Sequence, residues 1–262
     1  MSKICFIVGH GKSAKGGYDS GAVSGGFHEF KIAREIAKYA QAYYNANYQE
    51  QCDLMNYDGD LYLTERIKKV NKNSYSMIAE FHLNAGGGTG SEVYYYHGDS
   101  TGKKYAAAIS AAIAKQFGLR NRGAKVKLNG SGKDYFGIIR DTRPRAMLIE
   151  TVFIDRAGDL EKVKTAAGQK QCGEAIAKAL ATARGVAKKP AAKPATQTVK
   201  YFKKYTGTSG SIVTALKSIG ATSTFAYRGK IAKANGIKGY VGTASQNIKM
   251  LKLLKQGKLI KP

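Results

Sequence analysis

The feature that most constrains this chain is a break in composition at residues 186–200, VAKKPAAKPATQTVK. Two of the chain's four prolines lie there among Ala, Lys and Thr, and a segment of this composition is extended and buries no core. We therefore predict two domains, residues 1–185 and 200–262, joined by a linker at 186–199. A chain of 262 residues is long enough for one domain of medium size and one small domain.

Before this break, strand patterns and helix patterns alternate. Residues 3–10, KICFIVGH, have the composition of a buried strand, and residues 29–44 repeat apolar side chains at the spacing of one helical face. The alternation continues through segments at 63–71, 76–85, 91–98, 102–118, 146–155 and 171–185. It predicts an α/β fold with a mixed, mostly parallel sheet that helices cover on both faces.

After the break, three short amphipathic segments follow at residues 211–220, 224–236 and 244–257. Each of them closes at a glycine, the residue that most often ends a helix. This pattern predicts a small all-α domain of three helices.

The net charge of +25 calls for a polyanionic partner, for which nucleic acid, anionic lipid and the teichoic acids of a Gram-positive wall all qualify. Residues 200–262 hold twelve Lys, one Arg and no acidic residue, a charge of +13. Neither half of the chain has a recognised nucleic-acid motif, which disfavours that partner.

Three cysteines, odd in number and widely spaced, predict buried free thiols in a protein that folds in a reducing compartment. No segment reaches the roughly 18 apolar residues that a membrane span requires. The apolar run near the N-terminus is too short for the core of a signal peptide. We therefore expect synthesis in the cytoplasm without a signal peptide.

Polar residues follow several of the predicted strands at the point where each strand ends. His10 follows CFIVG, His82 lies in IAEFHLNA, Glu150 ends AMLIE, and Glu29 begins the first helix. Functional groups in open α/β sheets gather at these carboxyl ends. Two histidines and a carboxylate, with one position left to water, are the ligands of a catalytic zinc site, and a further glutamate can act as its base. The count fits His10, Glu29 and His82 as ligands and Glu150 as the base.

Each of these residues also has a simpler explanation. A histidine at a strand end can be an ordinary hydrogen-bonded residue, and Glu29 can serve only to complement the dipole of its helix. The ligands are scattered, and the chain has no compact HExxH motif. Glu150 can also form an ion pair with Arg140, Arg143 or Arg145.

The segments IVGHG, FHLNA and MLIETVFID, together with Glu29 at the start of a helix, resemble the four motifs of zinc-dependent N-acetylmuramoyl-L-alanine amidases. The family includes bacterial autolysins and phage endolysins, and the resemblance covers about residues 1–185. It implies that His10, Glu29 and His82 bind Zn²⁺ and that Glu150 is the catalytic glutamate. It also implies cleavage of the amide bond between N-acetylmuramic acid and the L-alanine of the stem peptide.

Three neighbouring segments are also similar to the family. YDSGAV resembles its Asp-x-Gly-Ala loop, Asn84 matches the asparagine after the second histidine, and NRGAK resembles its Arg-Gly substrate segment. This similarity implies that substrate is bound by Asp19, Asn84, Arg122 and Lys125.

Glu80 departs from the family pattern, in which this position is often small. It lies two residues before His82 and so faces the same side of the strand, either as a partner of the site or as a rival base. His28 directly precedes Glu29, and neighbouring residues on a helix point about 100° apart, so both cannot easily reach one metal ion. His97 has the sequence setting of a turn residue.

Residues 200–262 resemble the small C-terminal modules that anchor Gram-positive lysins and autolysins to the cell wall, in GSIVTALKSIG, RGKIAKANGI and GTASQN. The resemblance implies a lytic enzyme with peptidoglycan and anionic wall polymers as partners. The expected lack of a signal peptide fits an enzyme that reaches the wall after release through a membrane pore or by cell lysis. Two alternatives remain: a basic nucleic-acid-binding protein, and another zinc peptidase or deacylase on the same scaffold.

Overall fold

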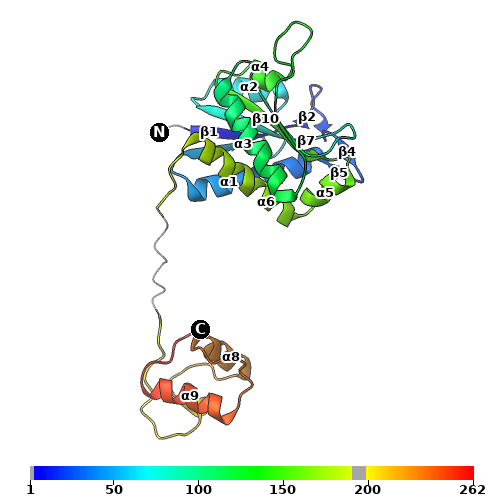
Figure 1. The fold of residues 1–262 in the computed structure, drawn as a ribbon. Coiled ribbons are helices and arrows are strands. Elements are labelled where there is room, and N and C mark those ends of the chain that lie inside the picture. Colours follow the sequence, from blue (N-terminus) through cyan, green and yellow to red (C-terminus); the bar gives the residue numbers. More distant parts are fainter. Residues whose placement is uncertain (1–2, 191–198) are drawn as a thin grey trace. The chain divides into compact units, whose positions relative to one another are not determined.

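The computed structural model describes residues 3–190 and 199–262 (Figure 1). The chain divides between residues 190 and 191 into two compact units, each with its own hydrophobic core. The predicted α/β fold followed by three helices is confirmed. Residues 191–198 of the predicted linker lie outside the described residues.

The main sheet of the first unit has six strands. Four of them are parallel, β8 is antiparallel to its neighbour β10, and β9 is parallel to β8. The sheet is therefore mixed and mostly parallel. Its order is β6 (Gln51–Met55), β1 (Lys3–Val8), β7 (Met77–Asn84), β10 (Arg145–Phe153), β8 (Ser91–Tyr95) and β9 (Asn121–Lys125).

Helices cover both faces of this sheet. On one face, the core contains side chains of α1 (Glu29–Asn47), α3 (Ser100–Phe117) and α6 (Ala166–Arg184). The short helix α5 (Ala157–Val163) precedes α6 and also contributes to this core. The core on the other face is built with α2 (Leu63–Asn71) and α4 (Gly137–Arg140). Two small hairpins follow β1, formed by β2 (Gly11–Lys12) with β3 (Tyr18–Asp19) and by β4 (Val23–Ser24) with β5 (Phe27–His28).

The pleat of the two central strands decides which face receives the functional side chains. On β7, Ala79 and Phe81 pack into the core with α1, α3 and α6. Because side chains alternate along a strand, Glu80 and His82 point to the face of α2 and α4. On β10, Leu148 belongs to the core of this second face, and Glu150 two residues later shares its direction.

The second unit contains α7 (Ile212–Ser218), α8 (Phe225–Ala234) and α9 (Ala244–Lys255). Threonine or serine side chains cap all three at their N-termini. The predicted closing glycines adopt positive φ just beyond each helix, at Gly220, Gly236 and Gly257. The core includes Leu216, Ile231, Met250 and Leu254.

The first residues of the predicted linker lie against the first unit. The Ala187 carbonyl accepts a hydrogen bond from Gln49 N at 3.0 Å, and Lys189 N donates to the Asn47 carbonyl at 2.8 Å. These bonds dock residues 186–190 beside the end of α1. The three cysteines are buried free thiols, as predicted. In the part of the chain that the structure describes, no helix is long and apolar enough to cross a membrane.

Gly173 marks the close approach of α6 to α1. A Cβ at this position would lie 2.5 Å from the Ile36 carbonyl oxygen and 2.7 Å from Ala40 N. Replacing glycine by alanine inside a helix ordinarily stabilises a protein by about 0.5–1 kcal/mol. For Gly173→Ala we expect the opposite sign, a loss of about 1–3 kcal/mol in the free energy of unfolding, because two main chains must move apart.

The matched control is Gly158→Ala in α5, where an added methyl group meets nothing within 4 Å. This variant should keep or slightly raise the free energy of unfolding. Urea unfolding of both variants measures the difference, and equal stabilisation by the two would contradict the close packing of α1 and α6.

Candidate metal centre

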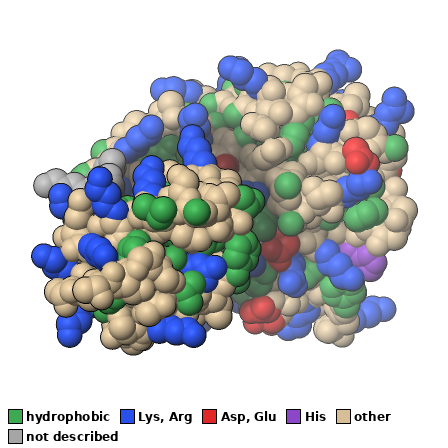
Figure 2. Space-filling view, turned by 90° about the horizontal axis from the view of Figure 1, so that it is seen from below, with side chains coloured by type: hydrophobic (Ala, Val, Ile, Leu, Met, Phe, Trp, Pro, Cys, Tyr) green, Lys and Arg blue, Asp and Glu red, His purple; other side chains and the backbone are tan. Residues whose placement is uncertain are grey.

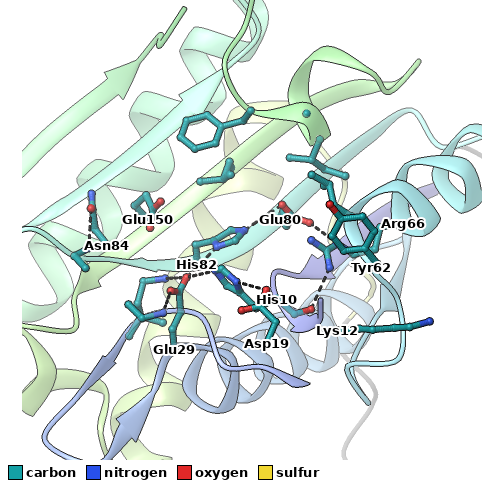
Figure 3. Close-up of a pocket in the computed structure, with 18 residues that line it drawn as sticks. His10, Lys12, Asp19, Glu29, Tyr62, Arg66, Glu80, His82, Asn84 and Glu150 are labelled. Atoms are coloured by element: carbon teal, nitrogen blue, oxygen red, sulfur yellow. Dashed lines mark hydrogen bonds and ion pairs between the residues drawn. The ribbon is translucent and has the colours of Figure 1, made fainter. Parts of the chain in front are cut away.

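Three elements bring the candidate ligands together. His10 follows β1, Glu29 is the first residue of α1, and His82 lies near the carboxyl end of β7. One ligand atom from each of them lies within 4.8 Å of the other two (Figure 3). The structure thus brings together the three residues that the sequence predicted as metal ligands.

Glu29 is the centre of this cluster. Its Oε1 lies 3.1 Å from His10 Nε2 and 2.9 Å from His82 Nδ1, and its side chain is buried. Oε1 also accepts a hydrogen bond from Leu83 N, while Oε2 accepts one from Ala22 N. Glu29 therefore binds both histidines and two loop or strand amides, which is more than complementing the dipole of α1.

The charges of these groups depend on one another. Burial alone would raise the pKa of Glu29, but the hydrogen bonds from His10 and His82 outweigh it and hold this pKa well below its usual range. Burial alone would lower the pKa of both imidazoles, and their hydrogen bonds to Glu29 raise it instead. Glu29 is therefore an ionised carboxylate that faces two imidazole nitrogens.

This donor set fits zinc. Two imidazole nitrogens and one carboxylate oxygen form the ligand set of catalytic zinc sites, which keep a further position open. Metal binding replaces protons on such ligands, because histidine must be neutral to coordinate. His10 Nε2 and His82 Nδ1 both lie near Glu29 Oε1, an arrangement that favours a cation among the three.

A carboxylate contacts the remaining nitrogen of each histidine. His10 Nδ1 lies 2.9 Å from Asp19 Oδ2, and His82 Nε2 lies 3.1 Å from Glu80 Oε2. Histidines that bind metals commonly donate their other ring N–H to a carboxylate, which fixes the orientation of the ring. Asp19, which the sequence predicted as a substrate-binding residue, lies beside His10 in this orienting position.

Glu150 lies directly beside His82, its partner in the register of β10 and β7. Its Oε2 is buried and makes no hydrogen bond within the described residues. Burial raises the pKa of Glu150 to about 7, and the nearby carboxylates Glu29 and Glu92 add to this rise. The ion pair with an arginine that the sequence left open is not formed in residues 3–190: Arg140 pairs with Asp141, and Arg145 with Asp99.

Both carboxylate oxygens of Glu80 already have partners. Its Oε1 accepts from Arg66 Nε at 2.9 Å, and its Oε2 faces His82. Burial would raise its pKa, but Arg66 and His82 lower it below the usual value. These contacts favour Glu80 as a partner of His82 over Glu80 as a rival base.

The cluster forms one side of a pocket of about 390 Å³. Glu150 and Asn84 reach the pocket from the sheet, and Lys12 reaches it from the first hairpin. Sequence reasoning did not find its apolar wall, because apolar side chains carry no chemical signal that sets them apart from core residues. That wall includes Tyr62, Leu63, Phe136, Ile138 and Leu148.

The other predicted substrate-binding residues lie at different distances from this pocket. Asn84 lines it and donates to Glu92 Oε1 at 2.8 Å. Arg122 does not line it, but its Nε donates to Glu92 Oε2 at 2.6 Å and so belongs to the same network. Lys125 pairs in register with Tyr94, farther from the carboxyl edge, and is not part of the pocket lining.

The remaining histidines lie outside the cluster, as predicted. His28 lies beside Tyr18, whose hydroxyl is 3.4 Å from His28 Nδ1. His97 lies in a turn, where its main-chain N–H donates to Asp134.

Sequence reasoning missed Arg66 and Asn56. Both are buried, and both donate to the main-chain carbonyl of His10. A signal for Arg66 was present, because it lies at helical spacing between Leu63 and Val70 and so shares the apolar face of α2.

Residues 4–182 match the family model described as N-acetylmuramoyl-L-alanine amidase. The chain is 31% identical over 170 residues to the N-acetylmuramoyl-L-alanine amidase CwlM of Bacillus licheniformis, covering 64% of this chain and 62% of CwlM. Cwp6 from Clostridium difficile is similar in structure, with a TM-score of 0.63 and 31% identity over 70% of this chain and 29% of Cwp6. The catalytic domain of CwlV, an N-acetylmuramoyl-L-alanine amidase from Bacillus (Paenibacillus) polymyxa var. colistinus, has a TM-score of 0.59 and 25% identity over 71% of this chain and 99% of that domain.

The fold and the site define an α/β protein with a candidate metal centre at the carboxyl edge of its sheet. The family match covers more than half of the chain. The chain belongs to the N-acetylmuramoyl-L-alanine amidase family, whose members depend on zinc. It spans less than two thirds of the length of CwlM, and the second unit lies outside the family match.

The geometry predicts which histidines bind metal. The purified protein should carry about one zinc ion per chain, and His10→Ala or His82→Ala should remove most of it, because each change deletes one of three ligands. His97→Ala is the matched control, since its ring lies outside the cluster, and it should retain the metal. Elemental analysis of the four proteins measures the zinc content. Full occupancy in both His10→Ala and His82→Ala would show that the ligands lie elsewhere.

Proposed function

We propose that this chain is a peptidoglycan hydrolase that uses zinc to cleave the amide bond between N-acetylmuramic acid and the L-alanine of the stem peptide. The observation that carries the proposal is one arrangement at the sheet edge. Glu29 lies between the imidazoles of His10 and His82, and the unpaired carboxyl of Glu150 lies beside them. Membership of the amidase family supports the substrate class.

His10, Glu29 and His82 would hold the zinc ion. When bound, zinc supplies a Lewis acid that polarises the amide carbonyl and lowers the pKa of a water molecule. Glu150, which lines the pocket, would take a proton from the attacking water as general base. The same carboxyl would then give a proton to the amide nitrogen as the C–N bond breaks.

The pocket supports a substrate with both apolar and polar parts. Its apolar wall suits the methyl groups of the lactyl ether and of L-alanine, which flank the scissile amide. Asn84 lines the pocket and would contact the substrate there. Within residues 3–190 Arg122 donates a hydrogen bond only through its Nε, and its guanidinium lies over the Phe153 ring. Its Nη groups would bind a carboxylate of the stem peptide. Lys125 stays a predicted contact for a longer part of the substrate.

The second unit supports targeting to the wall of a Gram-positive bacterium. Its residues contain no Asp or Glu, and Lys and Arg side chains are widely spread over the visible surface of the protein in Figure 2. A surface of this kind binds anionic polymers in a manner that weakens with salt. We propose that residues 200–262 bind an anionic wall polymer such as teichoic acid.

We further propose that the enzyme is made in the cytoplasm and acts on the wall after release through a membrane pore or by cell lysis, as a phage endolysin or a bacterial autolysin. The buried free thiols of Cys5, Cys52 and Cys172 support folding in a reducing compartment.

One experiment separates this function from its alternatives. Purified Gram-positive walls treated with the protein should lose turbidity and gain free N-terminal alanine. Lysis without new N-terminal alanine would instead indicate another zinc peptidase or deacylase. No lysis, with retention of nucleic acid, would indicate the nucleic-acid-binding alternative.

The roles of the two buried glutamates can be separated. Glu150→Ala should keep zinc and fold but lower the rate of amide cleavage by about 10²–10⁴-fold, because no base remains for the attacking water. Glu80→Ala, assayed at saturating zinc, should be far milder, since both carboxylate oxygens of Glu80 are held by Arg66 and His82. Cleavage rates on a soluble muropeptide measure both. An inactive Glu80→Ala beside an active Glu150→Ala would reverse the two roles.

The two units should divide binding and cleavage. Residues 1–190, which include the docked segment 186–190, should cleave a soluble muropeptide at nearly the rate of the full chain but lyse whole cells less well. Tethering raises the local concentration of the enzyme at the wall and leaves the chemical barrier unchanged. Residues 199–262 alone should sediment with walls at low salt and be released as salt rises. Wall binding by residues 1–190 alone, with none by 199–262 at any salt, would contradict this division.

A further inference from the structure

We propose that Arg66 is the positioning residue of the metal centre: its single buried guanidinium holds both histidines in place, His82 through Glu80 and His10 through the His10 main-chain carbonyl. This inference rests on the proposed function only in taking His10, Glu29 and His82 as the metal ligands. It assigns no contact between Arg66 and the substrate.

Arg66 reaches the site from α2, on the face of the sheet where Glu80 and His82 point. It is 5% exposed, and its Nε donates to Glu80 Oε1 at 2.9 Å. Its Nη1 donates to the His10 carbonyl at 3.1 Å (Figure 3). The same Nη1 donates to the Leu61 carbonyl at 2.9 Å. Three acceptors from separate parts of the chain thus converge on one planar fork of donors, a geometry that lysine cannot reproduce.

The contact with Glu80 controls the His82 ring. Glu80 is 2% exposed, and its second oxygen lies 3.1 Å from His82 Nε2, on the side of the ring away from Glu29. A carboxylate in this place fixes the rotation of a ligating imidazole and makes it a better ligand. Because Arg66 holds the other oxygen, the carboxylate cannot rotate away from His82.

The contact with the His10 carbonyl controls the turn that aims the His10 ring. His10 has a φ of +63°, in the left-handed region that residues other than glycine rarely adopt. Its carbonyl accepts hydrogen bonds from both Arg66 Nη1 and Asn56 Nδ2, the second at 2.8 Å. A backbone in this region persists when its surroundings over-determine it, and these two buried donors do so here.

A role in stability alone does not account for this ion pair. Burying two charges costs about as much as their attraction returns, so buried pairs contribute little net stability. The first unit also has a partly buried pair, between Arg184 and Glu50, which precedes β6 at the amino edge of the sheet. That pair touches none of the candidate ligands, whereas the Arg66 pair touches two of them.

The test compares zinc affinity in variants of the full chain, by competition with a chromophoric chelator. Glu80→Gln removes the carboxylate from His82, and Arg66→Lys keeps the charge but gives up the fork. We expect each to weaken zinc binding by about 10–100-fold, the usual effect of losing a partner of a ligating histidine. The visible spectrum of the Co²⁺-loaded protein should also change, because the ligand geometry changes.

Glu50→Gln is the matched control. It disrupts a partly buried Arg–Glu pair of the same unit that touches none of the candidate ligands, so it should lower the melting temperature while zinc affinity stays within about twofold of wild type. The proposal is overturned if Arg66→Lys and Glu80→Gln lower the melting temperature as Glu50→Gln does but bind zinc like the wild type.

A double variant, Arg66→Met with Glu80→Met, covers the case in which a single variant fails to fold. Replacing both members of a buried ion pair by apolar side chains of similar volume is often neutral for stability. The double variant should fold and still bind zinc about 10–100-fold more weakly, and wild-type affinity in it would also overturn the proposal. Failure of the proposed function would look different, because the wild-type chain itself would then bind no zinc or cleave no muropeptide.

Discussion

The site depends on one buried carboxylate. Removing the charged side chain of Glu29 from water costs several kcal/mol unless charged or hydrogen-bonding partners surround it. Those partners come from the end of β1, the loop before α1 and the end of β7, namely His10, the Ala22 amide, His82 and the Leu83 amide. Satisfying this single group therefore fixes where α1 begins and how the carboxyl ends of two parallel strands meet.

The parallel strands of the sheet bring these residues together. In neighbouring parallel strands the carboxyl ends lie at the same edge, so β1, β7 and β10 deliver their terminal residues to one place. Because side chains alternate along each strand, His82 and Glu150 point to the same face of the sheet. Only the short helix α2 and the single turn of α4 cover that face. The longer helices α1, α3 and α6 seal the opposite face. A pocket forms where the cover is thin and the polar residues gather.

Sequence reasoning could find this site because its residues carry a local signal and because the motifs around them resemble those of a known family. A histidine or glutamate that ends an apolar strand stands out, and His10, His82 and Glu150 are of this kind. The same reasoning missed β6 and β9, which are five residues long and only partly buried, so that no continuous apolar run marks them. It also placed the start of the linker at residue 186. In the structure, residues 187 and 189 form hydrogen bonds with the chain at the end of α1. Composition alone does not reveal such contacts.

The Arg66–Glu80 pair shows what kind of information a single sequence lacks. Each residue looks anomalous by itself, a charge on the apolar face of α2 and a charge inside the buried strand β7. Both are explained by the fold, because α2 packs on that face of the sheet and places Arg66 Nε 2.9 Å from Glu80 Oε1. Two buried charges with no partner would oppose folding, so the sequence tolerates them only together. The pair lies beside His82, and this position is the basis for our proposal that α2 supports the candidate metal ligands.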